Sequence, residues 1–171
     1  MVKLLRIFYA LTCLIRIGVI IPLLYSPVLG WFIIIFIDGF DYNLPLFSGV
    51  TYPKYQKIDK SLDILNRSYL LISAYLIFPW WIFVISAGFF VFRIIGDTLY
   101  FLTRSEKYFF IFPNFLEFFY IVYLLTGGIF ISLASAVPLK LFHEYAIHIN
   151  GWVDPILKKY IKNHPEHLRK V

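Results

Sequence analysis

The sequence predicts an all-α, polytopic membrane protein with six transmembrane helices and a short C-terminal interfacial helix. Three observations predict this fold class. The 171 residues are 60% hydrophobic and only 15% charged, whereas soluble domains are about half apolar and a quarter charged. The apolar residues fall into runs close to the roughly 20 residues that a helix needs to cross a bilayer. The connections between these runs alternate between charged and uncharged.

Composition also limits the partners and cofactors. In a chain this apolar, the net charge of +6 favours anionic lipid head groups or a phosphorylated substrate over nucleic acid. The single cysteine, Cys13, cannot form an intramolecular disulfide and argues against a structural zinc site. We therefore expect membrane lipids as partners and no nucleic acid.

The first two apolar runs predict the first two spans. Leu4 to Leu24 follows basic residues, as a signal peptide would, but this run is too long and lacks a small-residue cleavage site. Ser26 and Pro27 favour a helix start, because serine caps helices and proline fits the first turn. The second span is expected from Pro27 to Asn43.

A polar segment, Leu44 to Lys60, separates the second and third spans. Its lysines, prolines and glycine predict a surface connection in its early part. Helix is expected again from about Lys57, with the third span at Leu62 to Phe78. The corner Pro79-Trp80-Trp81 that follows is typical of a membrane interface, where tryptophan is enriched.

Three further runs complete the six spans. The fourth extends to Leu102, the fifth runs from Tyr108 to Leu125, and the sixth from Ile129 to Phe142, after the break at Thr126-Gly127-Gly128. Residues 1–142 are therefore expected to form a transmembrane domain and residues 143–171 a basic, amphipathic tail. Apolar residues at helical spacing between Val153 and Ile161 predict a helix on the membrane surface.

The charged connections fix the predicted orientation. The connections around Ser26, Pro79 and Gly127 carry no charge, whereas the alternate connections and both chain ends are basic. Positive charge marks the cytoplasmic side of a membrane protein. We expect an integral membrane protein with six spans and both termini in the cytoplasm.

Four aspartates cluster at the cytoplasmic ends of the second and third predicted spans: Asp38, Asp41, Asp59 and Asp63. Residues three or four apart share one helix face, so two adjacent helices would bring both pairs together. Converging carboxylates repel unless cations lie among them, and oxygen ligands suit Mg²⁺, Mn²⁺ or Ca²⁺. Asp38 lies about 16 Å along its helix from Pro27, within the roughly 30 Å bilayer core. An ionised group at that depth indicates a functional site.

An alternative is that these aspartates are solvated helix ends. Asp59 would lie in the first turn of its helix and Asp63 would pair with Arg67 one turn further along. For Asp59 and Asp63, this alternative explains the sequence as well as a metal site does. It is weaker for Asp38 and Asp41, because negative charge is unfavourable near a helix C-terminus.

The acidic spacing resembles a family signature. Asp38-x-x-Asp41, seventeen intervening residues and Asp59-x-x-x-Asp63 are similar to the CDP-alcohol phosphotransferase pattern D-x-x-D-G-x-x-A-R, eight residues, G-x-x-x-D-x-x-x-D. That family has a six-helix membrane domain with these aspartates on its second and third helices. Thr12 and Arg16 in the first predicted span also resemble the N-terminal pattern of that family.

The resemblance implies a reaction and a set of roles. A phosphoryl-alcohol unit would pass from a CDP-linked lipid donor to a small alcohol acceptor in phospholipid synthesis, with release of CMP. The four aspartates would hold one or two Mg²⁺ or Mn²⁺ ions, and Asp63 would also act as the general base. A homodimer is left open.

Other positions depart from the signature. Tyr42, Pro45, Leu46 and Tyr55 stand where it has glycine, alanine, arginine and glycine. Phosphate-binding charge could come instead from basic residues nearby, namely Lys54, Lys57, Lys60 or Arg67. These departures leave open a non-catalytic relative that acts as a membrane scaffold. A small transporter is a further alternative, although no inverted repeat supports it.

The remaining polar residues favour structural roles. Arg93 and Asp97 lie one turn apart and are expected to form an intramembrane ion pair. Asn114 and Glu117 share one helix face, as a polar helix contact or a cavity carboxylate. The four histidines lie in or near the tail, where a solvated surface is expected: His143, His148, His164 and His167.

Overall fold

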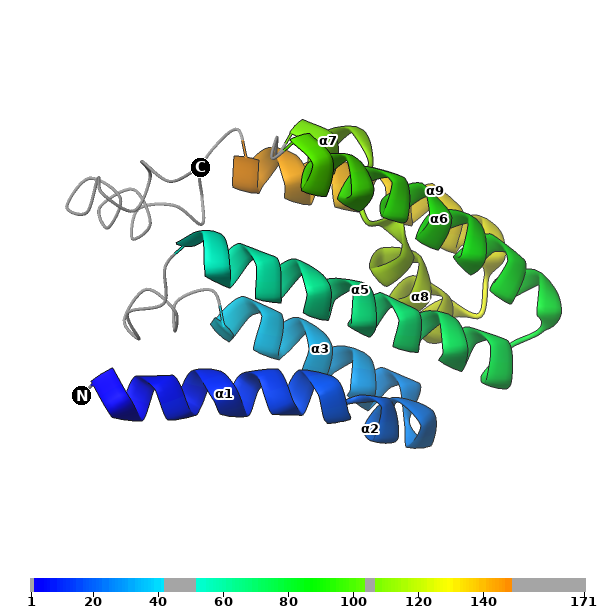
Figure 1. Cartoon of the computed structure of the whole chain (residues 1–171). Helices are drawn as coiled ribbons and strands as arrows, with labels where there is room; N and C mark the ends of the chain where they lie inside the picture. Colours follow the sequence, from blue (N-terminus) through cyan, green and yellow to red (C-terminus); the bar gives the residue numbers. More distant parts are fainter. Residues whose placement is uncertain (1, 42–51, 104–106, 149–171) are drawn as a thin grey trace. The chain divides into compact units, whose positions relative to one another are not determined.

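The computed structural model describes residues 2–41, 52–103 and 107–148, and every regular element in these ranges is an α-helix. Figure 1 shows the helices in chain order. Their bounds are α1 Val2–Gly18, α2 Ile20–Tyr25, α3 Pro27–Asp41, α5 Tyr52–Ile77, α6 Trp80–Thr103, α7 Lys107–Ile111, α8 Phe115–Thr126 and α9 Ile129–His148. The all-α prediction is confirmed.

Three stretches among the described residues are long and apolar enough to cross a membrane: Arg6–Tyr25, Trp80–Thr103 and Tyr108–Thr126. Two further apolar helices, Pro27–Asp38 and Ile129–His143, are shorter than a full crossing. Three membrane-length spans are thus found where six were expected. Helix α5 is long enough, but its first half carries too many charges.

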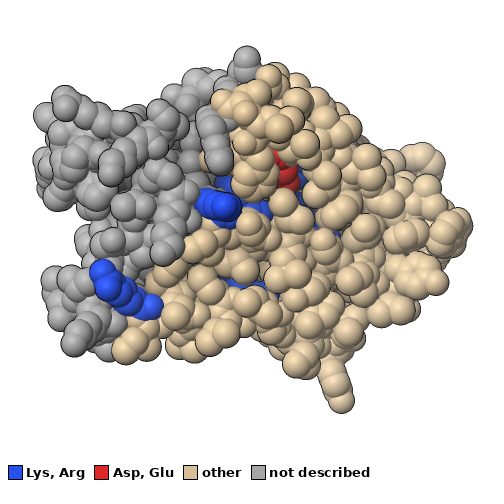
Figure 2. All heavy atoms as spheres, viewed as in Figure 1, with Lys and Arg blue, Asp and Glu red and all other residues tan. Residues whose placement is uncertain are grey.

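The surface of the described residues is also typical of contact with lipid. Large apolar side chains are widely exposed, for example Tyr25 at 93%, Phe130 at 83% and Leu102 at 76%. On the face drawn in Figure 2, charged side chains appear only in small patches. Apolar exposure on this scale is rare on soluble monomers and marks a membrane or protein interface.

The chain divides into two compact units, with the boundary in α5 between Asn66 and Arg67. In the first unit, α1 and α3 run side by side in opposite directions (Figure 1). Ser26 is extended and separates α2 from α3, and its carbonyl accepts a hydrogen bond from Gly30 N at 2.9 Å. A Cβ atom on Gly30 would lie 2.3 Å from Leu23 Cα, so glycine permits the close packing of α2 on α3. The predicted helix start at Pro27 is confirmed.

The second unit contains the later half of α5 with α6, α7, α8 and α9. Ile82, Phe119 and Ala136 form its buried core, surrounded by aromatic side chains. Gly127 ends α8 in the left-handed conformation with φ 64°, which glycine adopts without strain. Helix α9 packs on α8 immediately afterwards. The predicted break at Thr126-Gly127-Gly128 is therefore confirmed.

Several predicted boundaries need correction. Helix α5 begins at Tyr52, earlier than the expected Lys57, because Pro53 fits a first helical turn rather than a loop. The fifth run is divided into α7 and α8 by a break that contains Pro113, which lacks the N–H of a continuous helix. Helix α9 continues past Phe142 to His148, with Pro138 inside it. The predicted tail helix from Val153 to Ile161 lies outside the described residues.

Candidate functional site

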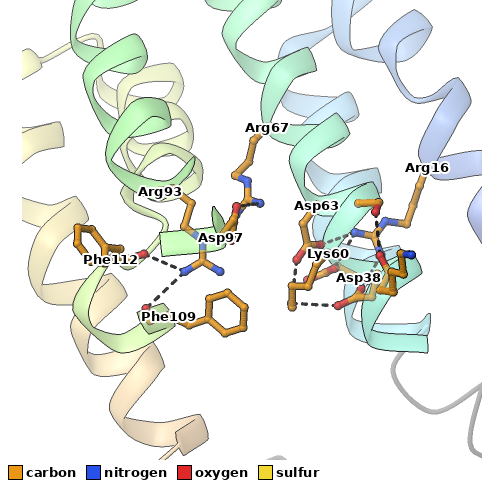
Figure 3. Close-up of polar contacts among 12 residues, drawn as sticks. Arg16, Asp38, Lys60, Asp63, Arg67, Arg93, Asp97, Phe109 and Phe112 are labelled. Carbon is orange, nitrogen blue, oxygen red and sulfur yellow. Dashed lines mark hydrogen bonds and ion pairs between the residues drawn. The ribbon is translucent and has the colours of Figure 1, made fainter. Parts of the chain in front are cut away.

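Three helices of the first unit bring charged side chains together around Arg16. Arg16 lies on α1, Asp38 on α3, and Asp59, Lys60 and Asp63 on α5. In Figure 3, the Arg16 side chain points toward Asp38 and Asp63, and Lys60 lies beside them. We call these five residues the acidic cluster. Three of the four predicted metal ligands therefore lie in one place.

The guanidinium of Arg16 contacts all three carboxylates. Its Nη1 donates to Asp59 Oδ1 at 3.0 Å, and its Nη2 donates to Asp63 Oδ1 at 2.5 Å. The same Nη2 lies 3.3 Å from Asp38 Oδ1. Arg16 is only 1% exposed, and such a buried guanidinium needs anionic partners to offset its lost hydration.

Asn66 fixes the other edge of Arg16. With its amide oriented to satisfy both neighbours, the side-chain oxygen accepts from Arg16 Nε at 3.1 Å. The amide nitrogen then donates to the Arg16 carbonyl at 3.0 Å. Arg16 is therefore held by α3 and α5 together, and its orientation is set by hydrogen bonds as well as by charge.

Lys60 supplies the second cation of the acidic cluster. Its Nζ lies 3.0 Å from Asp59 Oδ2 and donates to Asp63 Oδ2 at 2.9 Å. Burial lowers the pKa of Lys60, but the charges of Asp63 and Asp59 outweigh burial and raise this pKa above its ordinary value. Lys60 is therefore charged at neutral pH.

The three carboxylates lie close enough together that they could hold a cation. One oxygen from each lies within 4.8 Å of the others. Ligand oxygens on opposite sides of an ion are about 4.2 Å apart for Mg²⁺ and about 5 Å for Ca²⁺. The Asp38 side chain is half exposed, whereas Asp59 and Asp63 are mostly buried. The cluster therefore combines buried oxygen ligands with one side that is open.

Not every predicted site residue lies in this cluster. Asp41 is the last residue of α3, and its side chain lies outside the described part of the structure. Lys57 is exposed on α5. The alternative pairing of Asp63 with Arg67 is wrong, since Asp63 binds Arg16 and Lys60 while Arg67 binds Asp97.

A second group of buried charges lies in the second unit. Arg67 Nη2 donates to Asp97 Oδ2 at 2.6 Å, and Arg93 Nε lies 3.2 Å from Asp97 Oδ1. The predicted Arg93–Asp97 pair is confirmed. We call Arg67, Arg93 and Asp97 the basic cluster, because one carboxylate serves two arginines. Figure 3 shows its members converging on Asp97.

Two of these partnerships are not among those that the sequence predicts. Arg16 was compared only with a family pattern, yet it is the centre of the acidic cluster. Arg67 was predicted to contact substrate or Asp63, yet its partner lies 30 residues further along the chain. Each arginine lies within or beside an apolar run, and this position is the signal in the sequence that could have revealed the partnerships, since such a residue requires a buried anionic partner.

The other predicted polar residues have local roles. Asn114 precedes the first residue of α8 without a side-chain capping bond, and Glu117 lies in the first turn, where the helix dipole favours an acid. His143 is exposed, with Nδ1 3.4 Å from Lys140 Nζ. The side chain of His148, and His164 and His167 entirely, lie outside the described residues.

Comparison of this chain with protein-family models, with curated proteins and with solved structures finds no match. The resemblance to the CDP-alcohol phosphotransferases therefore rests on the spacing of the aspartates, and the activity that it implies stays a prediction.

Proposed function

We propose that this protein is a membrane-embedded transferase that uses a divalent cation, Mg²⁺ or Mn²⁺, bound at the acidic cluster. It would move a phosphoryl-alcohol unit from a CDP-linked lipid donor to an alcohol acceptor, in the manner of the CDP-alcohol phosphotransferases. The proposal includes the six-span arrangement with cytoplasmic termini, in which the shorter apolar helices and α5 cross together with the three longer spans.

One observation carries the proposal. Asp38, Asp59 and Asp63 come from two helices, yet each offers an oxygen within 4.8 Å of the others. Metal-assisted transfer from a diphosphate needs this kind of hard oxygen site, because the cation neutralises the phosphate charge and polarises the reacting bond. The spacing of these aspartates in the sequence and their convergence in space are independent reasons for the same assignment.

Charge at the acidic cluster determines how a cation would bind. The three carboxylates exceed the two cations, Arg16 and Lys60, by one negative charge among the described side chains. Arg16 contacts all three carboxylates, so a cation bound among them would share or replace these contacts. A displaced guanidinium would suit the donor phosphates, with which it can form two parallel hydrogen bonds.

The proposed reaction balances with the residues present. The acceptor oxygen forms a bond to the phosphorus of the transferred unit, and the bond from that phosphorus to the CMP oxygen breaks. Asp63 accepts the proton of the acceptor hydroxyl, and this proton replaces the contacts of Asp63 with Arg16 and Lys60. CMP leaves with the electron pair of the broken bond, and a cation held by Asp38 and Asp59 would offset its charge.

A second candidate function follows from the position of Arg16. Because its guanidinium already contacts all three carboxylates, the acidic cluster is also explained as a buried ion-pair network that joins α1, α3 and α5. The protein would then be a non-catalytic membrane scaffold. The two functions differ in one measurable property: only the transferase requires a divalent cation at the cluster.

Binding of Mn²⁺ to the purified full chain in detergent tests the metal site. Isothermal titration should detect Mn²⁺ binding to the wild type and at least tenfold weaker binding to Asp59→Asn, while Glu117→Gln in the second unit should bind as the wild type does. Equal binding by Asp59→Asn and wild type would reject the site and favour the scaffold.

Turnover tests the chemistry separately. With Mn²⁺, a panel of CDP-linked lipids and a panel of alcohols, the wild type should release CMP. Asp63→Asn should abolish release, because the general base is lost while the cluster keeps its shape. Absence of CMP across the panels, in protein that does bind Mn²⁺, would leave a metal site without the proposed transferase reaction.

A further inference from the structure

The proposed transferase has to bind the diphosphate of its donor, and two of the basic residues predicted for this contact are placed elsewhere. Arg67 belongs to the second unit and is bound to Asp97, and Lys57 is an exposed lysine on α5. Arg16, by contrast, lies among the proposed metal ligands. Its planar guanidinium matches phosphate oxygens better than the point charge of a lysine does.

Asn66 holds one edge of the Arg16 guanidinium. The side-chain oxygen of Asn66 accepts from Arg16 Nε at 3.1 Å, and its amide nitrogen donates to the Arg16 carbonyl at 3.0 Å. Asn66 is only 2% exposed and Arg16 1%. Breaking a buried hydrogen bond leaves its donor and acceptor without water to replace it. The Nε edge is therefore fixed by a neutral partner, independently of the carboxylates.

The opposite edge of the guanidinium faces the carboxylates. Nη1 donates to Asp59, and Nη2 donates to Asp63 and lies near Asp38. A cation among these carboxylates would compete with the Nη groups for oxygens, but it would not compete with Asn66 for Nε. The guanidinium would then keep its position while its Nη groups exchange carboxylate oxygens for other acceptors.

We propose that Arg16 binds the diphosphate of the donor through its Nη groups, and that Asn66 is the residue that positions it. The inference rests on the proposed function for the identity of the ligand. Phosphate oxygens accept two parallel hydrogen bonds from a guanidinium. A side chain already held in its binding conformation loses less rotamer freedom when the ligand arrives, which strengthens binding.

Asp38 marks the side from which a phosphate would reach Arg16. Its side chain is 50% exposed, whereas those of Asp59 and Asp63 are mostly buried. Its distance to Nη2, 3.3 Å, is also the longest of the three ion-pair distances between Arg16 and these carboxylates. Asp38 is therefore the carboxylate that a phosphate would most easily replace at Nη2.

Binding of CDP tests the role of Arg16 without turnover. CDP carries a diphosphate like that of the donor but lacks the lipid, and isothermal titration of the full chain in detergent, with Mn²⁺ present, measures its affinity. Arg16→Lys should weaken CDP binding about tenfold, because lysine keeps the charge but loses the guanidinium fork. Unchanged CDP binding by Arg16→Lys, or no CDP binding by the wild type, would overturn the proposal.

Asn66→Leu separates positioning from folding, because leucine has a similar shape but removes both hydrogen bonds to Arg16. CDP binding should fall severalfold in this variant, whereas Mn²⁺ should bind at least as strongly as in the wild type. A merely structural Asn66 would weaken both affinities together, and that result would overturn its positioning role. Asn114→Leu, the same change at another buried asparagine in the second unit, is the matched control and should alter neither affinity.

Release of CMP distinguishes failure of this inference from failure of the proposed function. CMP release by the wild type, together with CDP binding that does not depend on Arg16, would keep the transferase and reject the role of Arg16. CDP binding that depends on Arg16, without CMP release from any donor, would keep the phosphate contact and reject the transferase. If Arg16→Lys does not fold, Asn66→Leu decides: unchanged CDP binding in that variant overturns the proposal.

Discussion

The two buried charge clusters have opposite composition. In the acidic cluster one guanidinium, Arg16, is surrounded by three carboxylates, whereas in the basic cluster one carboxylate, Asp97, is shared by two guanidiniums. Both include an arginine that is 1% exposed. The two clusters are therefore built from the same residue types in opposite proportions.

Exposure also distinguishes the clusters. The Asp38 side chain of the acidic cluster is 50% exposed, and that of Asp97 in the basic cluster only 2%. Water can solvate part of the first cluster when a partner is removed, whereas the second has little access to water. Loss of a partner should therefore cost more in the basic cluster than in the acidic cluster.

The largest effect is expected from Asp97→Leu, which leaves two buried arginines without their shared carboxylate. Removing one partner of a buried pair costs about 3–5 kcal/mol, and this variant should fall in the upper half of that range. Denaturant unfolding in detergent micelles, followed by tryptophan fluorescence, measures the change. A loss smaller than that of Arg16→Met would reverse the proposed order of the two clusters.

Arg16→Met should have the second largest effect, about 3 kcal/mol, because three carboxylates then repel one another without their central cation. Mn²⁺ should restore much of the lost stability, since the ion can take the place of the guanidinium. Unfolding with and without Mn²⁺ measures this rescue. Arg6→Met, at an exposed position on the same helix, is the control and should show neither effect.

Helix packing near each cluster should show a smaller difference. Gly30→Ala places a Cβ 2.3 Å from the Leu23 backbone, whereas Gly96→Ala places one 2.6 Å from the Phe112 side chain. Overpacking costs about 1–3 kcal/mol, and the added Cβ at Gly30 meets three atoms of Leu23 within 2.7 Å, whereas the one at Gly96 meets a single atom, Phe112 Cβ, at that range. Thermal unfolding should therefore show a greater loss for Gly30→Ala. The opposite order would mean that the hairpin of α2 and α3 adjusts more easily than the break beside Phe112.

The smallest effect is expected from Lys60→Gln, about 1 kcal/mol, because Arg16 remains to balance the carboxylates. A raised folded-state pKa means that the Lys60 charge stabilises the fold fully below its unfolded pKa and is lost only as pH rises through the folded value. The stability difference between wild type and Lys60→Gln should therefore be constant from pH 7 to pH 9. A difference that shrinks across this interval would contradict the assigned role of Lys60.

Local patterns predicted much of the fold. Ser26 with Pro27, and Gly127 with Gly128, marked helix boundaries because serine, proline and glycine act on the backbone at their own positions. The Arg93–Asp97 pair was predicted for the same reason, since residues four apart share one helix face. Pro113 was overlooked as a break within an apolar run, and the start of α5 was placed too late.

By itself, the sequence determined an all-helical chain with membrane-length apolar runs, and it grouped the acidic residues at the ends of two helices. Periodicity and composition depend only on neighbours along the chain, so they are readable without a structure. The tertiary structure alone decided that Arg16 lies among Asp38, Asp59 and Asp63. It also decided that Arg67 pairs with Asp97 and not with Asp63. Each choice follows from the packing of helices that are distant in sequence, because a buried charge pairs with whichever opposite charge the fold brings within reach.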